Sequence, residues 1–428
     1  MAVQYKLMQS KFLSIFGSKT FKQTIMLYSA QLIGVPIGIL TSSITTRSLG
    51  PDNYGILAFY YTVTGFMLLF FRFGFASSGG LLIAQEKDNY EVKKLIGAMI
   101  TIFILIGIVY SLFVFIFSFF VDDIFNTDIG NILKWSSIPI LFYPFQFMIN
   151  SVTRGSNKIG MLSFYQIVPK IIYMVGILIF MALHKIGVIS LIILTVGNTV
   201  IINLLIITIW KPSFKELRLN IRKLLSKNRE YGIHLYLGQI SDQSTYGLDG
   251  ILISYFVNTT QLGFYNLAHT ITSPMVMLSQ ALSSSLFKEF VHRERIPKKI
   301  IYLNFLWLMS CAVGIILIGK YIVFLFFSNQ FLPVVSLIIP WSIASFFQGA
   351  YQPYNMFLGA KGEWRMGYLA FITTPINLIG NIILIPRYGA YGAAIASAIS
   401  MLFWYILFLL LYFKNINTRN CKETHEQV

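Results

Sequence analysis

The sequence predicts an all-α polytopic membrane protein, with twelve transmembrane helices arranged as two six-helix lobes around a central cavity. The first observation is composition: 56% of the 428 residues are hydrophobic and only 11% are charged, whereas soluble proteins carry about 25% charged residues. The second is the length of the apolar runs. Residues 95–120 contain no charged side chain, and about 20 apolar residues are enough to cross a bilayer as a helix.

The third observation is an internal repeat. The segment FNTDIGNILKWSSIPILFYPFQ, which ends at Gln146, resembles FFSNQFLPVVSLIIPWSIASFFQ, which ends at Gln348. Gly187 and Gly389 are separated by the same 202 positions. Parallel repeats of this kind relate two lobes of a transporter by an axis along the membrane normal, with the substrate carried at their interface.

The apolar segments define the predicted elements in order. The twelve helices are expected at 24–46, 55–83, 95–120, 133–153, 160–183, 187–210, 231–256, 263–287, 300–319, 333–358, 365–385 and 389–413. The corresponding domain map is an N-tail (1–23), an N-lobe (24–210), a basic linker (211–230), a C-lobe (231–413) and a C-tail (414–428).

The distribution of positive charge predicts the orientation. Of the 33 lysines and arginines, 26 fall in the two tails and in every second loop, including the linker 211–230, and only five fall in the opposite loops. Positive residues are retained on the cytoplasmic side. Both termini are therefore expected in the cytoplasm, and the net charge of +17 requires no nucleic-acid partner.

Several ionisable residues lie within the predicted spans. They are Arg72, Lys170, Asp242, Asp249 and His269. A charged side chain at the centre of a bilayer costs about 2.5–3.5 kcal/mol on insertion scales. These side chains are therefore expected to face the interior of the bundle. Snorkelling of the cations to the interface, or a purely structural ion pair, is the alternative.

The helix predicted at 231–256 has one polar face. At 100° per residue, six of its polar or small residues fall within about 100° of arc. The members of this stripe are His234, Gly238, Ser241, Asp242, Thr245 and Asp249. Such a stripe indicates a water-filled cavity, or a partner helix that it contacts through hydrogen bonds.

The intramembrane charges are divided between the lobes, with cations in the N-lobe and acidic groups in the C-lobe. A cavity with these two walls can close by ion pairing and open around an anion that replaces the acid. The candidate anion ligands are Arg47, Arg72 and Lys170, and the candidate ion-coupling residues are Asp242, Asp249 and His269.

No motif indicates an enzyme, a cofactor or a metal site. Its two cysteines, Cys311 and Cys421, do not have the spacing of a disulfide or metal framework, and it contains no HExxH and no GxSxG. The GIILIGK segment resembles a phosphate-binding loop, but it is followed by Tyr321 in place of serine or threonine and has no preceding strand. The predicted external loops are too short to hold a catalytic domain, so neither catalysis nor a cofactor is expected.

Three segments carry a family resemblance: TTRSLGPDNYG, FRFGF with the following IAQEKDNYEVKKLIG, and LGFYNLA. They resemble the polysaccharide-transporter branch of the multidrug and oligosaccharidyl-lipid exporter superfamily, and more narrowly the Wzx-type O-antigen flippases. The resemblance implies a MATE-like fold in the bacterial inner membrane. Its implied substrate is an undecaprenyl-pyrophosphate-linked oligosaccharide, whose anionic head group Arg72 and Lys170 would match.

The resemblance also implies partners: protons or sodium as the coupling ion, membrane lipid, and other proteins of polysaccharide assembly. Two further functions stay open. A multidrug or organic-cation exporter of the same superfamily would use the acidic residues, but the N-lobe cations oppose it. A non-transporting enzyme of polysaccharide assembly is disfavoured by the short external loops.

Overall fold

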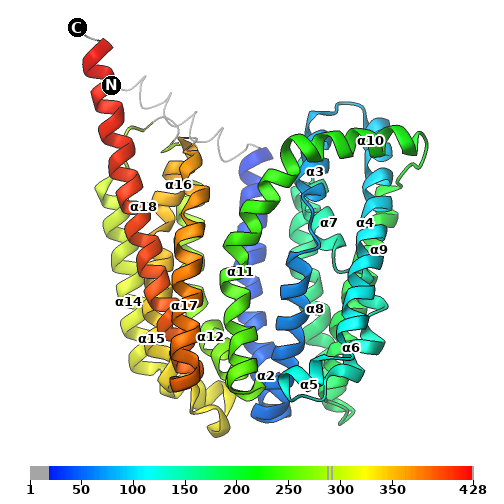
Figure 1. The fold of residues 1–428 in the computed structure, drawn as a ribbon, viewed down its shortest axis with the longest axis vertical. Helices are drawn as coiled ribbons and strands as arrows, with labels where there is room; N and C mark the ends of the chain where they lie inside the picture. Colours follow the sequence, from blue (N-terminus) through cyan, green and yellow to red (C-terminus); the bar gives the residue numbers. More distant parts are fainter. Residues whose placement is uncertain (1–18, 287–288, 291–292, 362, 427–428) are drawn as a thin grey trace, which may run out of the picture. The chain divides into compact units, whose positions relative to one another are not determined.

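All regular structure in the described part of the chain is helical (Figure 1). The computed structural model describes residues 19–286, 289–290, 293–361 and 363–426. Seven helical stretches in these ranges are long and apolar enough to cross a membrane. They are Asn89–Phe117, Ile159–Ala182, Val188–Trp210, Lys298–Phe327, Val334–Ala360, Ala370–Tyr388 and Ala390–Ile416. The predicted class, an all-α polytopic membrane protein, is confirmed.

Eight helices overlap the predicted spans one for one. They are α4 (Asn89–Phe117), α8 (Ile159–Ala182), α9 (Val188–Trp210), α11 (Ile233–Phe256), α12 (Thr259–Ser285), α14 (Lys298–Ile322), α17 (Ala370–Tyr388) and α18 (Ala390–Glu426). The helices α9 and α18 each begin directly after one of the two glycines, Gly187 and Gly389, that are 202 positions apart in the sequence repeat.

The first predicted helix and most of the second form one element, α2 (Lys19–Leu69), which is kinked at Gly50. Gly50 has φ 71° and ψ 175°, a conformation that is essentially restricted to glycine. Pro51 follows directly, and its fixed φ suits the first position of a new helix. The LGP sequence therefore turns the chain without a separate loop.

The predicted helix 55–83 is wrong in one respect, because the chain unwinds between α2 and α3 (Phe75–Gln85). Phe73 has φ 46° and Gly74 has φ 76°. A side chain on Gly74 would collide with the backbone carbonyl of Gly232. Glycine is therefore required at position 74 for two reasons: the left-handed backbone conformation and the close approach of the Gly232 backbone.

Two other predicted helices, 133–153 and 333–358, are also interrupted. The first divides into α6 (Gly130–Ser136), the 3₁₀ turn η1 (Pro139–Phe142) and α7 (Phe145–Gly155), and the second into α15 (Val334–Ala350) and α16 (Gln352–Ala360). Prolines start the new pieces, because they cannot donate the hydrogen bond that would continue the helix. The remaining short elements are α5 (Val121–Phe125), α10 (Leu217–Lys227), η2 (Asn228–Gly232), η3 (Val323–Phe327), η4 (Asn329–Phe331) and η5 (Trp364–Tyr368).

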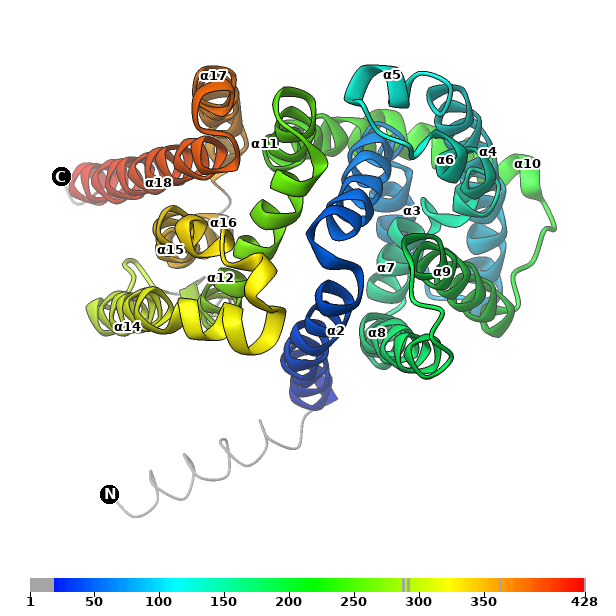
Figure 2. The same ribbon diagram turned by 90° about the horizontal axis from the view of Figure 1, so that it is seen from below.

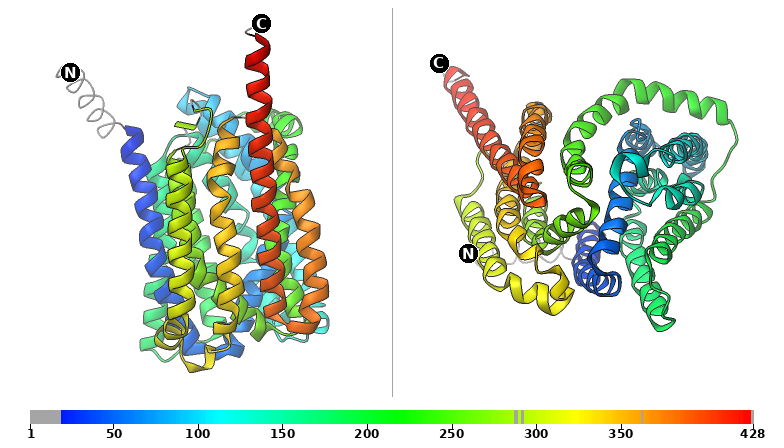
Figure 3. Two further views of the ribbon diagram at one scale, coloured as in Figure 1. Left: turned by 90° about the vertical axis from the view of Figure 1, so that its left-hand side faces the viewer. Right: turned by 60° about the horizontal axis from the view of Figure 1, so that its bottom comes forward.

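The helices pack into two compact units. The described part of the first unit contains residues 19–41, 71–115 and 135–236, and its helices α3, α7, α8 and α9 pack on one another (Figure 2). The second contains 42–70, 116–134 and the rest of the chain from 237, and its helices α14, α15, α17 and α18 lie side by side (Figure 3). The lobe boundaries expected from the sequence stay a prediction.

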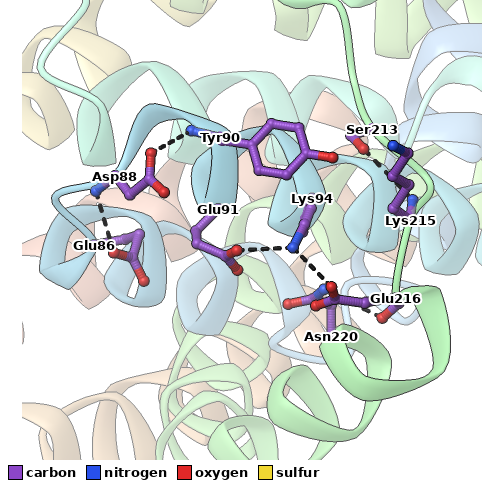
Figure 4. A network of polar contacts seen from close by, with 9 residues as sticks. All are labelled: Glu86, Asp88, Tyr90, Glu91, Lys94, Ser213, Lys215, Glu216 and Asn220. Atoms are coloured by element: carbon purple, nitrogen blue, oxygen red, sulfur yellow. Dashed lines mark hydrogen bonds and ion pairs between the residues drawn. The ribbon is translucent and has the colours of Figure 1, made fainter.

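The basic linker forms the helix α10, which packs against α3 and runs across the end of that helix (Figure 1). Its first turn is fastened to the start of α4 (Figure 4). The ammonium group of Lys94 lies 2.8 Å from a carboxylate oxygen of Glu91 and 3.0 Å from one of Glu216. The Lys94 side chain is only 7% exposed, whereas that of Glu216 is 54% exposed, so this ion pair positions the start of the linker from a partly solvated site.

A hydrogen bond from Asn415 joins the loop before α17 to α18, and an ion pair within that loop holds the acceptor in place. Arg365 donates from Nε and from one terminal nitrogen to the two carboxylate oxygens of Glu363, at 2.6 and 2.7 Å. Asn415 on α18 donates to the same carboxylate at 2.8 Å. These contacts, led by the Arg365 hydrogen bonds, lower the pKa of Glu363 to about 2 from an ordinary value of 4.5.

We expect the contribution of Glu363 to stability to depend on pH. A carboxyl group whose pKa is lowered by folding stabilises the folded state fully above its unfolded pKa, and this contribution is lost as the pH falls towards the folded pKa. The difference in melting temperature between the wild type and Glu363→Gln should be constant above about pH 5 and shrink towards about pH 2. A difference that grows with acidity would contradict the assignment of this ion pair.

Candidate functional site

The residues predicted for anion binding lie at three separate places in the fold. Arg72 lies in the unwound segment between α2 and α3, Lys170 lies on α8, and Arg47 lies on α2 before the kink. Arg72 and Lys170 belong to the first unit, whereas Arg47 belongs to the second. Their predicted common role in phosphate binding stays a prediction.

The guanidinium of Arg72 lies over an aromatic ring. Its central carbon is 4.0 Å from the centre of the Phe147 ring on α7. Its Nε atom is buried and has no hydrogen-bond partner in the described part of the chain. A cation–π contact offsets part of the cost of removing a guanidinium from water, but it leaves the in-plane N–H donors available for another acceptor.

The break that contains Arg72 is held in place by one buried asparagine. Asn228 in η2 donates from Nδ2 to the backbone carbonyl of Phe73 at 2.9 Å, and its Oδ1 accepts from the hydroxyl of Ser78 at 3.1 Å. The first bond satisfies a backbone carbonyl of the unwound turn, which is a condition for non-helical backbone inside a membrane, and the second holds the asparagine in place. The position of Arg72 is therefore determined by the fold.

Lys170 and Arg47 have different surroundings from Arg72. The Lys170 side chain is exposed and passes over Gly34 of α2, where an added Cβ would lie 2.7 Å from its Nζ. Arg47 donates from Nε to the carbonyl oxygen of Phe326 at 2.9 Å and from a terminal nitrogen to that of Leu325. Two of the nitrogen atoms of the Arg47 guanidinium are therefore already engaged by these carbonyls.

Asp249 lies at the centre of a buried hydrogen-bond network in the second unit. Its side chain is on α11, and the residue is only 2% exposed. Its Oδ2 accepts from the hydroxyl of Tyr265 at 2.5 Å and from that of Ser397 at 2.7 Å, and its Oδ1 accepts from Nδ2 of Asn381 at 2.5 Å. Asn381 Nδ2 also lies 3.0 Å from Oδ1 of Asn377. The network thus joins α11, α12, α17 and α18.

No arginine, lysine or histidine in the described part of the second unit forms an ion pair with Asp249. An isolated carboxylate is costly to bury, even with three hydrogen bonds, because its net charge remains. A proton on the carboxyl group or a bound cation would remove that cost. The described residues contain no cluster of three or more histidine, cysteine, aspartate or glutamate side chains that could hold a metal ion.

The other two predicted coupling residues are Asp242 and His269, and only His269 has a described side chain. Asp242 lies on the same helix α11, but its side chain is outside the described residues. His269 is exposed, and its ring centre lies 4.6 Å from that of Trp341. Trp341 in turn lies 5.0 Å from the ring of Tyr265. His269 is therefore linked to the network through one intervening aromatic ring.

A pocket of about 360 Å³ adjoins this network in the second unit. Its lining comes from α2, α11 and α12. The lining residues are Tyr61, Thr62, Gly65, Phe66, Leu69, Gly247, Gly250, Tyr265 and Asn266. One of them, Tyr265, also donates the hydrogen bond to Asp249. The pocket and the buried carboxylate therefore share a side chain.

Sequence reasoning identified Asp249 but missed its partners on α12, α17 and α18. The available signal was a pair of asparagines, Asn377 and Asn381, four residues apart in an apolar segment. Residues at this spacing lie on one face of a helix, and asparagine inside a membrane needs a partner. Nothing in the sequence indicated that Asp249 was this partner.

The fold is that of an all-α polytopic membrane protein with two helical units. The sequence model of the family described as polysaccharide biosynthesis protein matches residues 20–287, which is more than half of the chain. The chain therefore belongs to this family, and the resemblance to the polysaccharide-transporter flippases is confirmed.

Two relatives from Haloferax volcanii are similar in sequence. The chain is 22% identical to the probable low-salt glycan biosynthesis flippase Agl15 over 396 residues, covering 89% of this chain and 80% of that protein. It is 27% identical to the probable flippase AglR over 272 residues, covering 58% of this chain and 54% of that protein.

Solved structures with a similar fold include transporters of two kinds. The lipid II flippase MurJ in an inward closed conformation has a TM-score of 0.69 at 18% identity, over 92% of this chain and 89% of that chain. A multidrug resistance MATE family transporter in an inward-facing conformation also has a TM-score of 0.69, at 14% identity, over 92% of this chain and 98% of that chain. The predicted MATE-like fold is therefore confirmed.

We expect the Asp249 network to stabilise the second unit measurably. Ser397→Ala removes a hydroxyl that donates to a carboxyl group, and loss of such a bond costs about 1.5–3 kcal/mol. Ser400→Ala is the matched control on the same helix, because Ser400 is also buried and donates only to the neutral carbonyl of Thr373 at 3.3 Å. The control should cost about 1 kcal/mol or less.

The measurement is reversible unfolding of the purified protein in detergent, repeated in an Asp249→Asn background. There the effect of Ser397→Ala should fall towards that of the control. Equal costs for the two serines in the wild-type background would show that Asp249 is not the centre of the network.

Proposed function

We propose that this protein is a flippase that moves an undecaprenyl-pyrophosphate-linked oligosaccharide, the O-antigen repeat unit, from the cytoplasmic to the periplasmic leaflet of a bacterial inner membrane. Transport proceeds by alternating access, and both termini lie in the cytoplasm. The family match supports a role in polysaccharide biosynthesis. The name of Agl15, a probable glycan biosynthesis flippase, and that of MurJ, a lipid II flippase, support a glycan or lipid cargo of related kind.

The observation that carries the proposal is the state of Arg72. A permanently charged guanidinium lies at a break in a membrane helix, with a buried Nε that has no acceptor in the described part of the chain. A pyrophosphate supplies acceptors of the matching charge, and the flat guanidinium can hold two phosphate oxygens at once. An organic-cation cargo would be repelled by the same group.

The other predicted residues take supporting roles in the proposal. Lys170, an exposed residue on α8, supplies a second and more flexible positive charge for the pyrophosphate. Arg47 holds carbonyls of Leu325 and Phe326, and we assign it to the phosphate only at a stage of transport in which those contacts are released.

Asp249, with Asp242 and His269, is proposed to couple transport to an ion gradient. The buried carboxyl of Asp249 has three donors and no cationic partner in the described part of its unit, so it is suited to take up and release one positive charge per cycle. We propose a proton as that charge. Sodium is the rival, since carboxylate, amide and hydroxyl oxygens are ligands for hard cations.

We expect Arg72→Ala to abolish display of surface polysaccharide while the protein remains inserted and abundant. Arg72→Lys should retain part of the activity, because the charge remains although the two-pronged hydrogen bonding is lost. Loss of a charge-assisted contact of about 1.5–3 kcal/mol corresponds to at least a tenfold loss of transport. The measurement is complementation of a flippase-null strain, with protein level checked by immunoblot.

The matched control is Arg154→Ala, which removes an exposed arginine at the end of α7 and should leave transport unchanged. If Arg72→Ala displays full polysaccharide at normal abundance, Arg72 is a packing residue and the proposed phosphate site is wrong.

A further inference from the structure

The pocket formed by α2, α11 and α12 has a wall chemistry that differs from the rest of the proposed site. Among its nine described lining residues none is charged. Three are aromatic (Tyr61, Phe66 and Tyr265), and Thr62 and Asn266 supply a hydroxyl and an amide. The described walls offer no counter-charge to a pyrophosphate or to an organic cation, which favours a neutral ligand.

Two close helix contacts define one side of this pocket. An added Cβ on Gly247 would lie 2.7 Å from Cδ2 of Phe66, and one on Gly250 would lie 2.7 Å from Cγ2 of Thr62. The glycines of α11 therefore let α2 approach closely enough to bring the aromatic and polar side chains to one face. Gly65 is different, because it lines the pocket and an added Cβ there would meet no atom within 4 Å.

The size and composition of the pocket favour a sugar ring. A volume of about 360 Å³ is near the lower end of the range of about 300–1,000 Å³ for small-molecule sites, which suits one ring better than a long isoprenoid chain. Aromatic faces pack on the C–H groups of a pyranose, and an amide and hydroxyls can bind its hydroxyl groups. A purely apolar chain would leave Thr62 and Asn266 without a role.

Tyr265 connects this pocket to the buried carboxyl group. Its ring forms part of the pocket wall, whereas its hydroxyl donates to Asp249 at 2.5 Å and lies 3.0 Å from the hydroxyl of Ser397. The residue is only 4% exposed, so its ring has little room to move independently of its hydroxyl. A ligand that shifts the ring must also alter the hydrogen bonding of Asp249.

We propose that this pocket is a subsite for one neutral sugar ring of the cargo, and that Tyr265 is the positioning residue through which its occupancy changes the ion affinity of Asp249. This inference rests on the proposed function, because it assumes a glycosylated lipid cargo. Coupling of this kind is reciprocal. If bound cargo changes the affinity for the ion by a certain factor, the bound ion changes the affinity for the cargo by the same factor.

The test compares two probes on the purified full-length protein in nanodiscs: undecaprenyl pyrophosphate, and undecaprenyl pyrophosphate carrying one N-acetylglucosamine. The wild type should bind the glycosylated lipid at least tenfold more tightly. Gly65→Leu fills the pocket from a position with free space, so it should remove this preference and leave the affinity for the sugar-free lipid within twofold. Gly314→Leu is the matched control, because Gly314 also has no atom near an added Cβ and does not line the pocket.

Tyr265→Phe separates sugar binding from coupling. It keeps the ring and removes the hydroxyl, so the preference for the glycosylated lipid should persist. The affinity for the glycosylated lipid is then measured with and without sodium, and at acidic and neutral pH. The ratio of the affinities with and without the ion should be at least fivefold smaller than in the wild type. A merely structural role would change affinity without changing its ion dependence.

Any of the following results would overturn the proposal. Gly65→Leu could retain the tenfold preference, it could lose affinity for the sugar-free lipid, which would make the pocket a lipid site, or Tyr265→Phe could keep the full ion dependence. If the wild type binds neither probe, the proposed function itself fails. If it binds both equally, the cargo class stands and only the sugar subsite is rejected.

Discussion

A polar group inside a membrane must find its partners within the protein, and Asp249 shows how far this constraint shapes the fold. One buried carboxyl group accepts hydrogen bonds from Tyr265, Asn381 and Ser397 on three other helices. With no water in the hydrocarbon core, each unsatisfied group would cost several kcal/mol. The network therefore fixes the mutual register of α11, α12, α17 and α18. Any change in the charge of Asp249 alters the hydrogen bonds that join all four helices.

The same constraint explains the treatment of the helix break at Arg72. Unwinding exposes backbone carbonyls and amides, and Asn228 bonds the carbonyl of Phe73 from the end of the basic linker. The linker is itself fastened to α4 through the Lys94 ion pairs. The protein can keep a strained segment with a permanent cation because a neighbouring element bonds the backbone beside it.

Apolar run length predicted the helical spans well, but the sequence did not predict where helices break. Residues 95–120 and 187–210 were placed within a few positions because hydropathy determines membrane helices directly. The break at Gly74 depends on the close approach of Gly232, a tertiary contact that no local pattern records. Likewise, the cost of burying a charge identified Asp249 and Arg72 as candidate site residues. It could not identify Asn381 and Ser397 as partners of Asp249, because both lie more than 100 positions further along the chain.

The central claim, that the protein moves a lipid-linked oligosaccharide by using an ion gradient, can be measured in proteoliposomes that contain only the purified protein and the glycosylated lipid. A membrane-impermeant lectin reports how much oligosaccharide reaches the opposite leaflet. We predict movement that needs the protein and accelerates under an imposed proton gradient, with Asp249→Asn insensitive to that gradient. Movement that requires sodium and ignores a proton gradient would replace the proton with sodium. No movement of the glycosylated lipid under either gradient would contradict the account.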